Sequence, residues 1–126
     1  MKVLILAGGQ GTRLMEETVV RPKPMVEIGG MPLLWHIMMH YGQAGLNEFV
    51  VALGYKGTYI KRWFSEYAMY SSNLRIHTQK GEVERSDNTL PDWQIDLVET
   101  GNKTGTGGRI KRLREYVDNK TFMLTW

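Results

Sequence analysis

Cysteine is absent from this sequence of 126 residues. Without thiols, the chain forms neither a disulfide framework nor a cysteine-ligated metal site, and the absence suits a reducing compartment. Long apolar runs are missing as well. No stretch approaches the ~20 residues that span a bilayer, and the apolar run within residues 1–6 is too short for a signal peptide. We therefore expect a cytoplasmic protein with no membrane partner.

A strong excess of charge of one sign is missing too. Lysine and arginine number 16 against 13 aspartate and glutamate residues, which gives a net charge of +3. This small excess suits an anionic ligand but does not separate a phosphate compound from nucleic acid, and no nucleic-acid recognition motif is identifiable. Hydrophobic residues make up 42% of the chain, as in ordinary globular proteins. Residues 1–126 are therefore expected to form a single domain.

The first half of the chain alternates between two kinds of apolar pattern. Continuous apolar runs predict buried strands at 2–7 and 48–53, because parallel strands covered on both faces are apolar on both. Apolar residues spaced three and four apart predict helices at 32–44 and 58–69, and Gly45 suits the end of the first of them. This order predicts an α/β fold with a mostly parallel sheet and right-handed crossovers.

The second half of the chain is less regular. Turn-forming residues alternate there with shorter apolar patterns. In chain order we expect a strand at 74–78, a polar loop at 80–92, a half-exposed strand at 94–99, a glycine-rich loop at 101–108, a helix with the apolar stripe Ile110, Leu113, Tyr116 and Val117, and a strand at 121–126.

A glycine-rich turn follows the first strand, with glycines at 8, 9 and 11. Its backbone N–H groups can point at phosphate oxygens, and ligands of open parallel sheets bind beyond the carboxyl ends of strands. Arg13 adds a guanidinium that binds phosphate oxygens in two places. The turn matches neither the dinucleotide fingerprint, because Leu14 stands at its third glycine, nor the Walker loop. A tight structural turn is the alternative interpretation.

Two further basic residues are candidates for anion binding. Lys23 lies between Pro22 and Pro24, which restrict the backbone and disfavour helix there. Arg109 follows two glycines at the expected start of a helix, where unpaired N–H groups favour anions. The alternative for each is a solvated surface residue.

Histidines and aromatic residues on the predicted helices have simpler interpretations. His36 and His40 are four residues apart, a spacing that can bind a metal, but no third ligand is evident nearby. We therefore expect two surface histidines. Trp63, Phe64 and Tyr67 could stack on a base, but their helical spacing predicts core packing instead.

The turn at 6–14, together with the segment Lys23-Pro24-Met25, resembles the signature of sugar nucleotidyltransferases. The resemblance covers nearly the whole chain and implies a Rossmann-like three-layer α/β/α nucleotide-diphospho-sugar transferase fold, which appears here in truncated form. Further segments look like those of glucose-1-phosphate cytidylyltransferases, namely residues 16–30, 34–38, 53–57, 100–101 and 104–109.

The resemblance implies a reaction in which glucose 1-phosphate attacks the α-phosphorus of CTP, giving CDP-glucose and pyrophosphate. Catalysis of such a transfer comes mainly from positioning and charge stabilisation. The implied catalytic residues are Arg13, acting on the leaving pyrophosphate, and Lys23, acting at the reacting centre. The implied substrate-binding residues are Leu6, Ala7, Gly8, Gly9, Gln10, Gly11, Thr12, Arg13, Lys23, Thr104 and Arg109.

The resemblance also implies Mg²⁺ as cofactor and a homo-oligomer. In the family, the strand matching 121–125 continues into a magnesium-binding aspartate, whose position lies beyond Trp126. We therefore expect no metal ligand in this chain, and an exposed sheet edge that favours self-association. Two alternatives stay open at this point: a module that binds CTP without turning it over, and a uridylyl or thymidylyl transferase of the same family. A basic nucleic-acid-binding domain is the weakest alternative.

Overall fold

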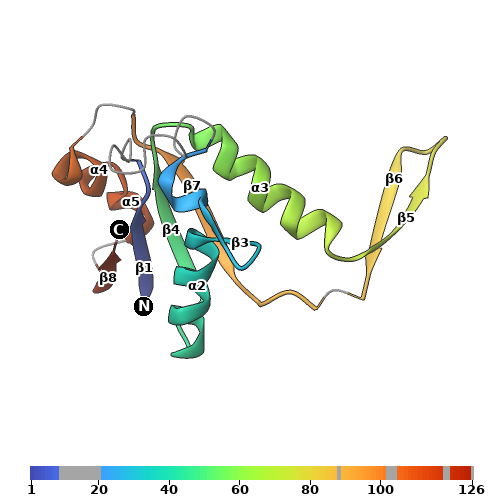
Figure 1. Ribbon diagram of the computed structural model, residues 1–126, viewed down its shortest axis with the longest axis horizontal. Helices are drawn as coiled ribbons and strands as arrows, with labels where there is room; N and C mark the ends of the chain where they lie inside the picture. The colour runs from blue at the N-terminus through green and yellow to red at the C-terminus, as the bar shows by residue number, and fades with distance from the viewer. Residues whose placement is uncertain (9–20, 88, 102–104, 118–119, 126) are drawn as a thin grey trace.

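A parallel four-stranded sheet forms the centre of the computed structural model (Figure 1), which describes residues 1–8, 21–87, 89–101, 105–117 and 120–125. The strand order is β7-β4-β1-β8, and every pairing between these neighbours is parallel. The predicted parallel α/β fold is therefore confirmed. The strands are β1 (Lys2–Leu6), β4 (Glu48–Leu53), β7 (Gln94–Glu99) and β8 (Phe122–Thr125).

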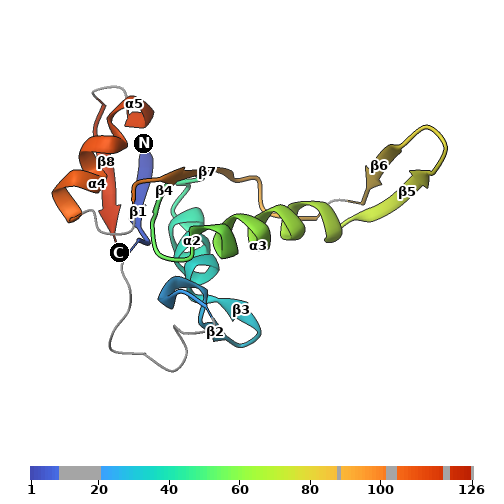
Figure 2. The same ribbon diagram turned by 90° about the horizontal axis from the view of Figure 1, so that it is seen from above.

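Helices cover both faces of this sheet, as Figures 1 and 2 show. Alternate residues of a strand point to opposite faces, so Val3 and Ile5 join one apolar cluster while Leu4 joins the other. The first cluster packs against α2 (Leu33–Gln43) and α3 (Gly57–Tyr70), and the second packs against Leu113, between α4 (Thr106–Arg112) and α5 (Arg114–Val117). The three-layer α/β/α arrangement is thus confirmed.

The strand register places three strand ends at one edge of the sheet. Leu6 of β1 pairs with Ala52 of β4, and Leu53 at the end of β4 pairs with Glu99 at the end of β7. Because all of these strands are parallel, the segments that follow them meet at this carboxyl edge. Ligands of open α/β sheets bind at such an edge.

A small hairpin precedes α2 and connects to a turn of 3-10 helix, η2 (Lys23–Met25). Strands β2 (Glu27–Ile28) and β3 (Met31–Pro32) pair antiparallel. Gly29 and Gly30 between them have φ of 61° and 85°, values that a two-residue hairpin turn requires and that glycine adopts freely. The N–H of Leu33 donates to the carbonyl of Val26 at 2.9 Å, so this hairpin ties the η2 turn to the start of α2.

The predicted loop at 80–92 is wrong in its first part, because residues 82–86 form a strand. Strands β5 (Asn73–His77) and β6 (Glu82–Ser86) pair antiparallel in a separate two-stranded sheet. We call this hairpin the arm, and both views show it projecting from the far end of α3, away from the central sheet. All five residues of β6 are exposed. Its sequence therefore lacks the alternation of apolar and polar residues that predicts a half-buried strand.

The predicted start of the third helix is also wrong. Helix α4 begins at Thr106 and includes Gly107 and Gly108, although glycine inside a helix costs about 1 kcal/mol relative to alanine. The helix is interrupted at Leu113, which is fully buried and separates α4 from α5. Leu113 packs in the apolar cluster with Leu4 and Val50 of the sheet. Within the described ranges, no helix has the length and apolar character needed to cross a membrane.

Candidate functional site at the carboxyl edge of the sheet

The backbone after β1 is bound to the neighbouring strand at the carboxyl edge. The N–H of Ala7 donates to the carbonyl of Ala52 at 3.0 Å, and the N–H of Tyr55 donates to the carbonyl of Gly8 at 3.3 Å. On the other side of β4, the N–H of Thr100 donates to the carbonyl of Leu53 at 2.8 Å. The start of the glycine-rich turn therefore lies beside the segments that follow β4 and β7.

The described part of the predicted phosphate-binding turn is its first three residues. Leu6 is half-buried at the end of β1, and Ala7 and Gly8 are buried. Their positions at the carboxyl end of a central strand agree with the prediction. The other predicted contacts in this region, Gly9, Gln10, Gly11, Thr12, Arg13 and Thr104, lie outside the described residues.

Lys23 sits on a turn whose neighbours are buried. Pro22 and Met25 are buried while the Lys23 side chain is exposed. The N–H of Met25 donates to the carbonyl of Pro22 at 2.8 Å, and the N–H of Val26 donates to the carbonyl of Lys23 at 3.1 Å. The prolines were expected to disfavour helix there, but Lys23–Met25 forms one turn of 3-10 helix. The Lys23 side chain points from this turn into solvent and is exposed.

Arg109 is 5% exposed, so the alternative of a solvated helix residue is wrong. Its Nη1 donates to Oγ1 of Thr100 at 2.7 Å and to the carbonyl of Leu53 at 3.3 Å. Its Nη2 donates to the carbonyl of Gly8 at 3.1 Å. Burial lowers the pKa of Arg109, and the nearby charge of Arg112 lowers it further, although arginine keeps its charge in proteins.

The prediction that Arg109 lies at the start of a helix, among unpaired backbone N–H groups, is wrong. Arg109 lies inside α4, and its N–H donates to the carbonyl of Gly105 at 3.0 Å. The positive group that reaches the carboxyl edge is therefore its side chain. The direct contact of Arg109 with the nucleotide stays a prediction.

The sequence reasoning did not single out Thr100 as a site residue. Thr100 is fully buried; its hydroxyl donates to the carbonyl of Leu53 at 2.8 Å and accepts from Arg109. Its own carbonyl accepts from Nη1 of Arg112. A polar residue directly after a strand, at the edge where ligands bind, is the sequence signal that points to it.

The glycines at this edge leave room for the Arg109 guanidinium. A Cβ on Gly8 would lie 1.9 Å from Nη1 of Arg109, and one on Gly54 would lie 2.6 Å from the same atom. On Gly54 it would also lie 2.8 Å from the carbonyl oxygen of Gly8. Gly8 was predicted to expose the backbone to phosphate, and the structure adds a second reason for glycine there, namely close packing with Arg109.

The histidines and aromatic residues of α2 and α3 have structural partners. Nε2 of His36 lies 2.7 Å from the carbonyl oxygen of Ile28. Trp63 and Tyr67 stack with ring centroids 5.0 Å apart, and Phe64 is buried in the core cluster. The predicted core packing of these aromatic residues is confirmed.

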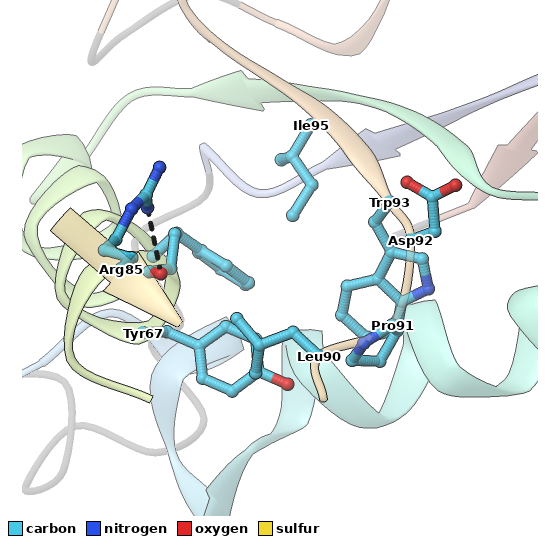
Figure 3. A pocket seen from close by; sticks show the side chains of 9 residues that line it. Tyr67, Arg85, Leu90, Pro91, Asp92, Trp93 and Ile95 are labelled. Carbon is cyan, nitrogen blue, oxygen red and sulfur yellow. Dashed lines mark hydrogen bonds between the residues drawn. The ribbon is translucent and has the colours of Figure 1, made fainter. Parts of the chain in front are cut away.

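A separate cavity of about 220 Å³ lies at the opposite, amino end of β7. Figure 3 shows Arg85 near Tyr67 on one side of it, and Trp93 and Ile95 on the other. Nη1 of Arg85 donates to the carbonyl of Ala68 at 3.3 Å, which ties the arm to α3. Because β7 runs away from this cavity, the cavity is not part of the carboxyl edge.

The fold and its edge define a nucleotide-binding α/β domain. The model of the family described as "Nucleotidyl transferase" matches residues 2–119, and the chain belongs to this family. Within the family, it is 48% identical to the glucose-1-phosphate cytidylyltransferase of Salmonella typhimurium over 127 aligned residues, which cover 100% of this chain and 49% of that protein. The probable glucose-1-phosphate cytidylyltransferase of Bacillus subtilis is 44% identical, with the same coverage.

Solved structures show the same fold. HddC from Yersinia pseudotuberculosis, in a crystal structure described as complexed with GMP-PN, superposes with a TM-score of 0.70 at 30% identity. The match covers 98% of this chain and 45% of HddC. The chain thus spans about half the length of the relatives that it matches.

Proposed function

We propose that this chain is the nucleotide-binding half of a glucose-1-phosphate cytidylyltransferase, which forms CDP-glucose and pyrophosphate from CTP and glucose 1-phosphate. The observation that carries the proposal is the 48% identity to the Salmonella typhimurium enzyme across the entire chain. Two basic residues support it independently: the Arg109 guanidinium lies beside the carbonyl of Gly8 at the carboxyl edge, and the Lys23 side chain is exposed on the η2 turn.

In the proposed reaction, a phosphate oxygen of glucose 1-phosphate attacks the α-phosphorus of CTP. The new P–O bond forms as the bond to pyrophosphate breaks. Backbone N–H groups of the turn at 8–12 bind the nucleotide, Arg13 stabilises charge on the pyrophosphate, and Lys23 neutralises charge at the reacting phosphorus. Thr104 and Arg109 complete the proposed substrate contacts.

Magnesium is the proposed cofactor of the whole enzyme, but the residues described here do not make its site. Mg²⁺ prefers several oxygen ligands in octahedral geometry. Across the described ranges, no group of three histidine, cysteine, aspartate or glutamate side chains could hold a metal. Glu99, at the end of β7, forms an ion pair with Lys61 at 2.9 Å. No step of the proposed mechanism is therefore assigned to the ion.

Calorimetry with CTP, UTP and dTTP tests the proposed nucleotide. We expect CTP to bind to the chain about tenfold more tightly than UTP, because a base-specific hydrogen bond contributes on the order of 1 kcal/mol or more. Equal or tighter binding of UTP contradicts the cytidylyl assignment. Pyrophosphate release, measured with CTP, glucose 1-phosphate and Mg²⁺, tests turnover: release above the uncatalysed rate selects the enzyme over the non-catalytic module.

We also propose that copies of the chain associate through the arm. Ile76 and Val83 pair across the arm and therefore share a face with Leu74, and the three side chains are 60%, 51% and 37% exposed. An isolated two-stranded hairpin is only marginally stable in water. Sedimentation analysis should give a mass above that of the monomer, and Ile76→Glu should shift it toward the monomer. A wild-type monomer at high concentration contradicts this proposal.

A further inference from the structure

Thr100 has a hydroxyl whose hydrogen-bond directions are fixed by its neighbours. A threonine hydroxyl has one donor and two acceptor positions. The donor is used on the carbonyl of Leu53 at 2.8 Å, so the contact with Nη1 of Arg109 at 2.7 Å is one in which the hydroxyl accepts. Because Thr100 is fully buried, water does not replace either bond. The hydroxyl therefore sets where the guanidinium lies.

The guanidinium of Arg109 joins the segments after three different strands. It reaches the carbonyl of Leu53 at the end of β4, Thr100 after β7, and the carbonyl of Gly8 after β1. The guanidinium fits there because Gly8 and Gly54 have no Cβ, which would overlap with it. A planar guanidinium suits this arrangement, because its donors are held in a rigid fork. Helix α4 is thereby attached to the first residue of the glycine-rich turn.

We infer that Thr100 is a positioning residue for nucleotide binding: its hydroxyl holds the Arg109 guanidinium against the carbonyl of Gly8, the residue at which the glycine-rich turn begins. The inference rests on the proposed function, because the turn is the proposed binding site for the phosphates of CTP. Thr100 itself does not contact the nucleotide. Its effect passes through Arg109 to the backbone of Gly8, which the N–H of Tyr55 also contacts at 3.3 Å.

The test compares Thr100→Val with Thr100→Ser. Valine keeps the shape of threonine and removes the hydroxyl, which leaves a charged donor short of an acceptor, whereas serine keeps the hydroxyl. Calorimetry should show CTP affinity about tenfold weaker in Thr100→Val, the usual consequence of losing a hydrogen bond to a charged group. Thr100→Ser should bind CTP as tightly as the wild type. Equal CTP affinity in Thr100→Val and the wild type would overturn the inference.

Hydrogen exchange gives a readout that does not depend on CTP. In Thr100→Val the amide of Tyr55 should exchange about tenfold faster, because its acceptor at Gly8 is no longer fixed, while the amide of Val50 in the middle of β4 keeps its protection. Unchanged exchange at Tyr55 would overturn the inference even if CTP affinity fell. Gly45→Ala is the control for a general loss of stability: Gly45 has φ of 85° and nothing near its Cβ position, so the variant is strained but leaves Tyr55 exchange and CTP affinity unchanged.

The two proposals fail in different ways. If the wild type does not bind CTP, the proposed function is wrong, and the Tyr55 exchange rate alone decides the role of Thr100. If Thr100→Val does not fold, Arg109→Lys replaces it, because a lysine keeps the charge but lacks the fork that reaches Gly8 and Thr100 together. Because Arg109 is itself a proposed substrate contact, the readout for this variant is the exchange of the Tyr55 amide: faster exchange is expected, and exchange at the wild-type rate would overturn the inference.

Discussion

Replacing Arg13 and Lys23 together by alanine is expected to weaken CTP binding at least about a hundredfold, because each charge-assisted contact contributes about 1.5–3 kcal/mol. Lys23 is exposed on a turn whose neighbours Pro22 and Met25 are buried, so the substitution should leave the backbone in place. Calorimetry measures the loss of affinity. Urea unfolding of the single variant Lys23→Ala should show a change in the free energy of unfolding within about 0.5 kcal/mol, as for surface substitutions.

A matched control separates direct contact from the general effect of net charge. The double variant Arg75→Ala/Lys80→Ala also removes one arginine and one lysine charge, but from exposed positions of the arm and its turn. If the +3 net charge attracts CTP only at long range, the two double variants should weaken binding equally, and the effect should fade in high salt. We expect the arm variant to bind CTP as the wild type does. CTP affinity untouched by the loss of Arg13 and Lys23 would contradict the proposed site.

Gly54→Ala is expected to lower the free energy of unfolding by about 3 kcal/mol, the upper end of the usual cost of overpacking. A Cβ there would lie 2.8 Å from the carbonyl oxygen of Gly8 and 2.9 Å from that of Gly101. These are backbone atoms of two neighbouring segments, so neither moves without displacing the edge of the sheet. Typical domains unfold at a cost of 5–15 kcal/mol, which makes this a large fraction of the total stability.

Gly107→Ala is the control for this substitution. Gly107 lies within α4 and has nothing within 4 Å of its Cβ position. Alanine there should raise the free energy of unfolding by about 0.5–1 kcal/mol, because it loses less backbone freedom than glycine in a helix. Urea titration measures both variants. A Gly54→Ala protein as stable as the wild type would show that the carboxyl edge is not close-packed.

Burial patterns explain why most of the central fold was predictable from the sequence. The strand predicted at 48–53 coincides with β4, whose last five residues are buried, and the helices predicted at 32–44 and 58–69 match α2 and α3 within one residue at each end. These elements bury apolar faces, and the period of those faces is readable locally. Strand β6 has no such face and depends on pairing with β5, which local periodicity does not show.

The candidate site was predictable only in its local parts. A restricted backbone around Lys23 follows from the prolines on both sides, but the turn of 3-10 helix at Lys23–Met25 does not. The surroundings of Arg109 do not follow from its neighbours in sequence, because its partners Leu53 and Gly8 are 56 and 101 residues away. That Arg109 is buried and connects the ends of β4 and β1 is therefore visible only in the three-dimensional structure.

The 101-residue separation between Arg109 and Gly8 has a consequence for the order of events during synthesis. A chain emerging from the ribosome contains Gly8 almost from the start, but it lacks the guanidinium that contacts the carbonyl of Gly8. Contacts between distant residues form late because the chain entropy of closing the loop must be overcome first. This part of the carboxyl edge therefore assembles only after α4 has been synthesised and Arg109 has reached Leu53 and Gly8.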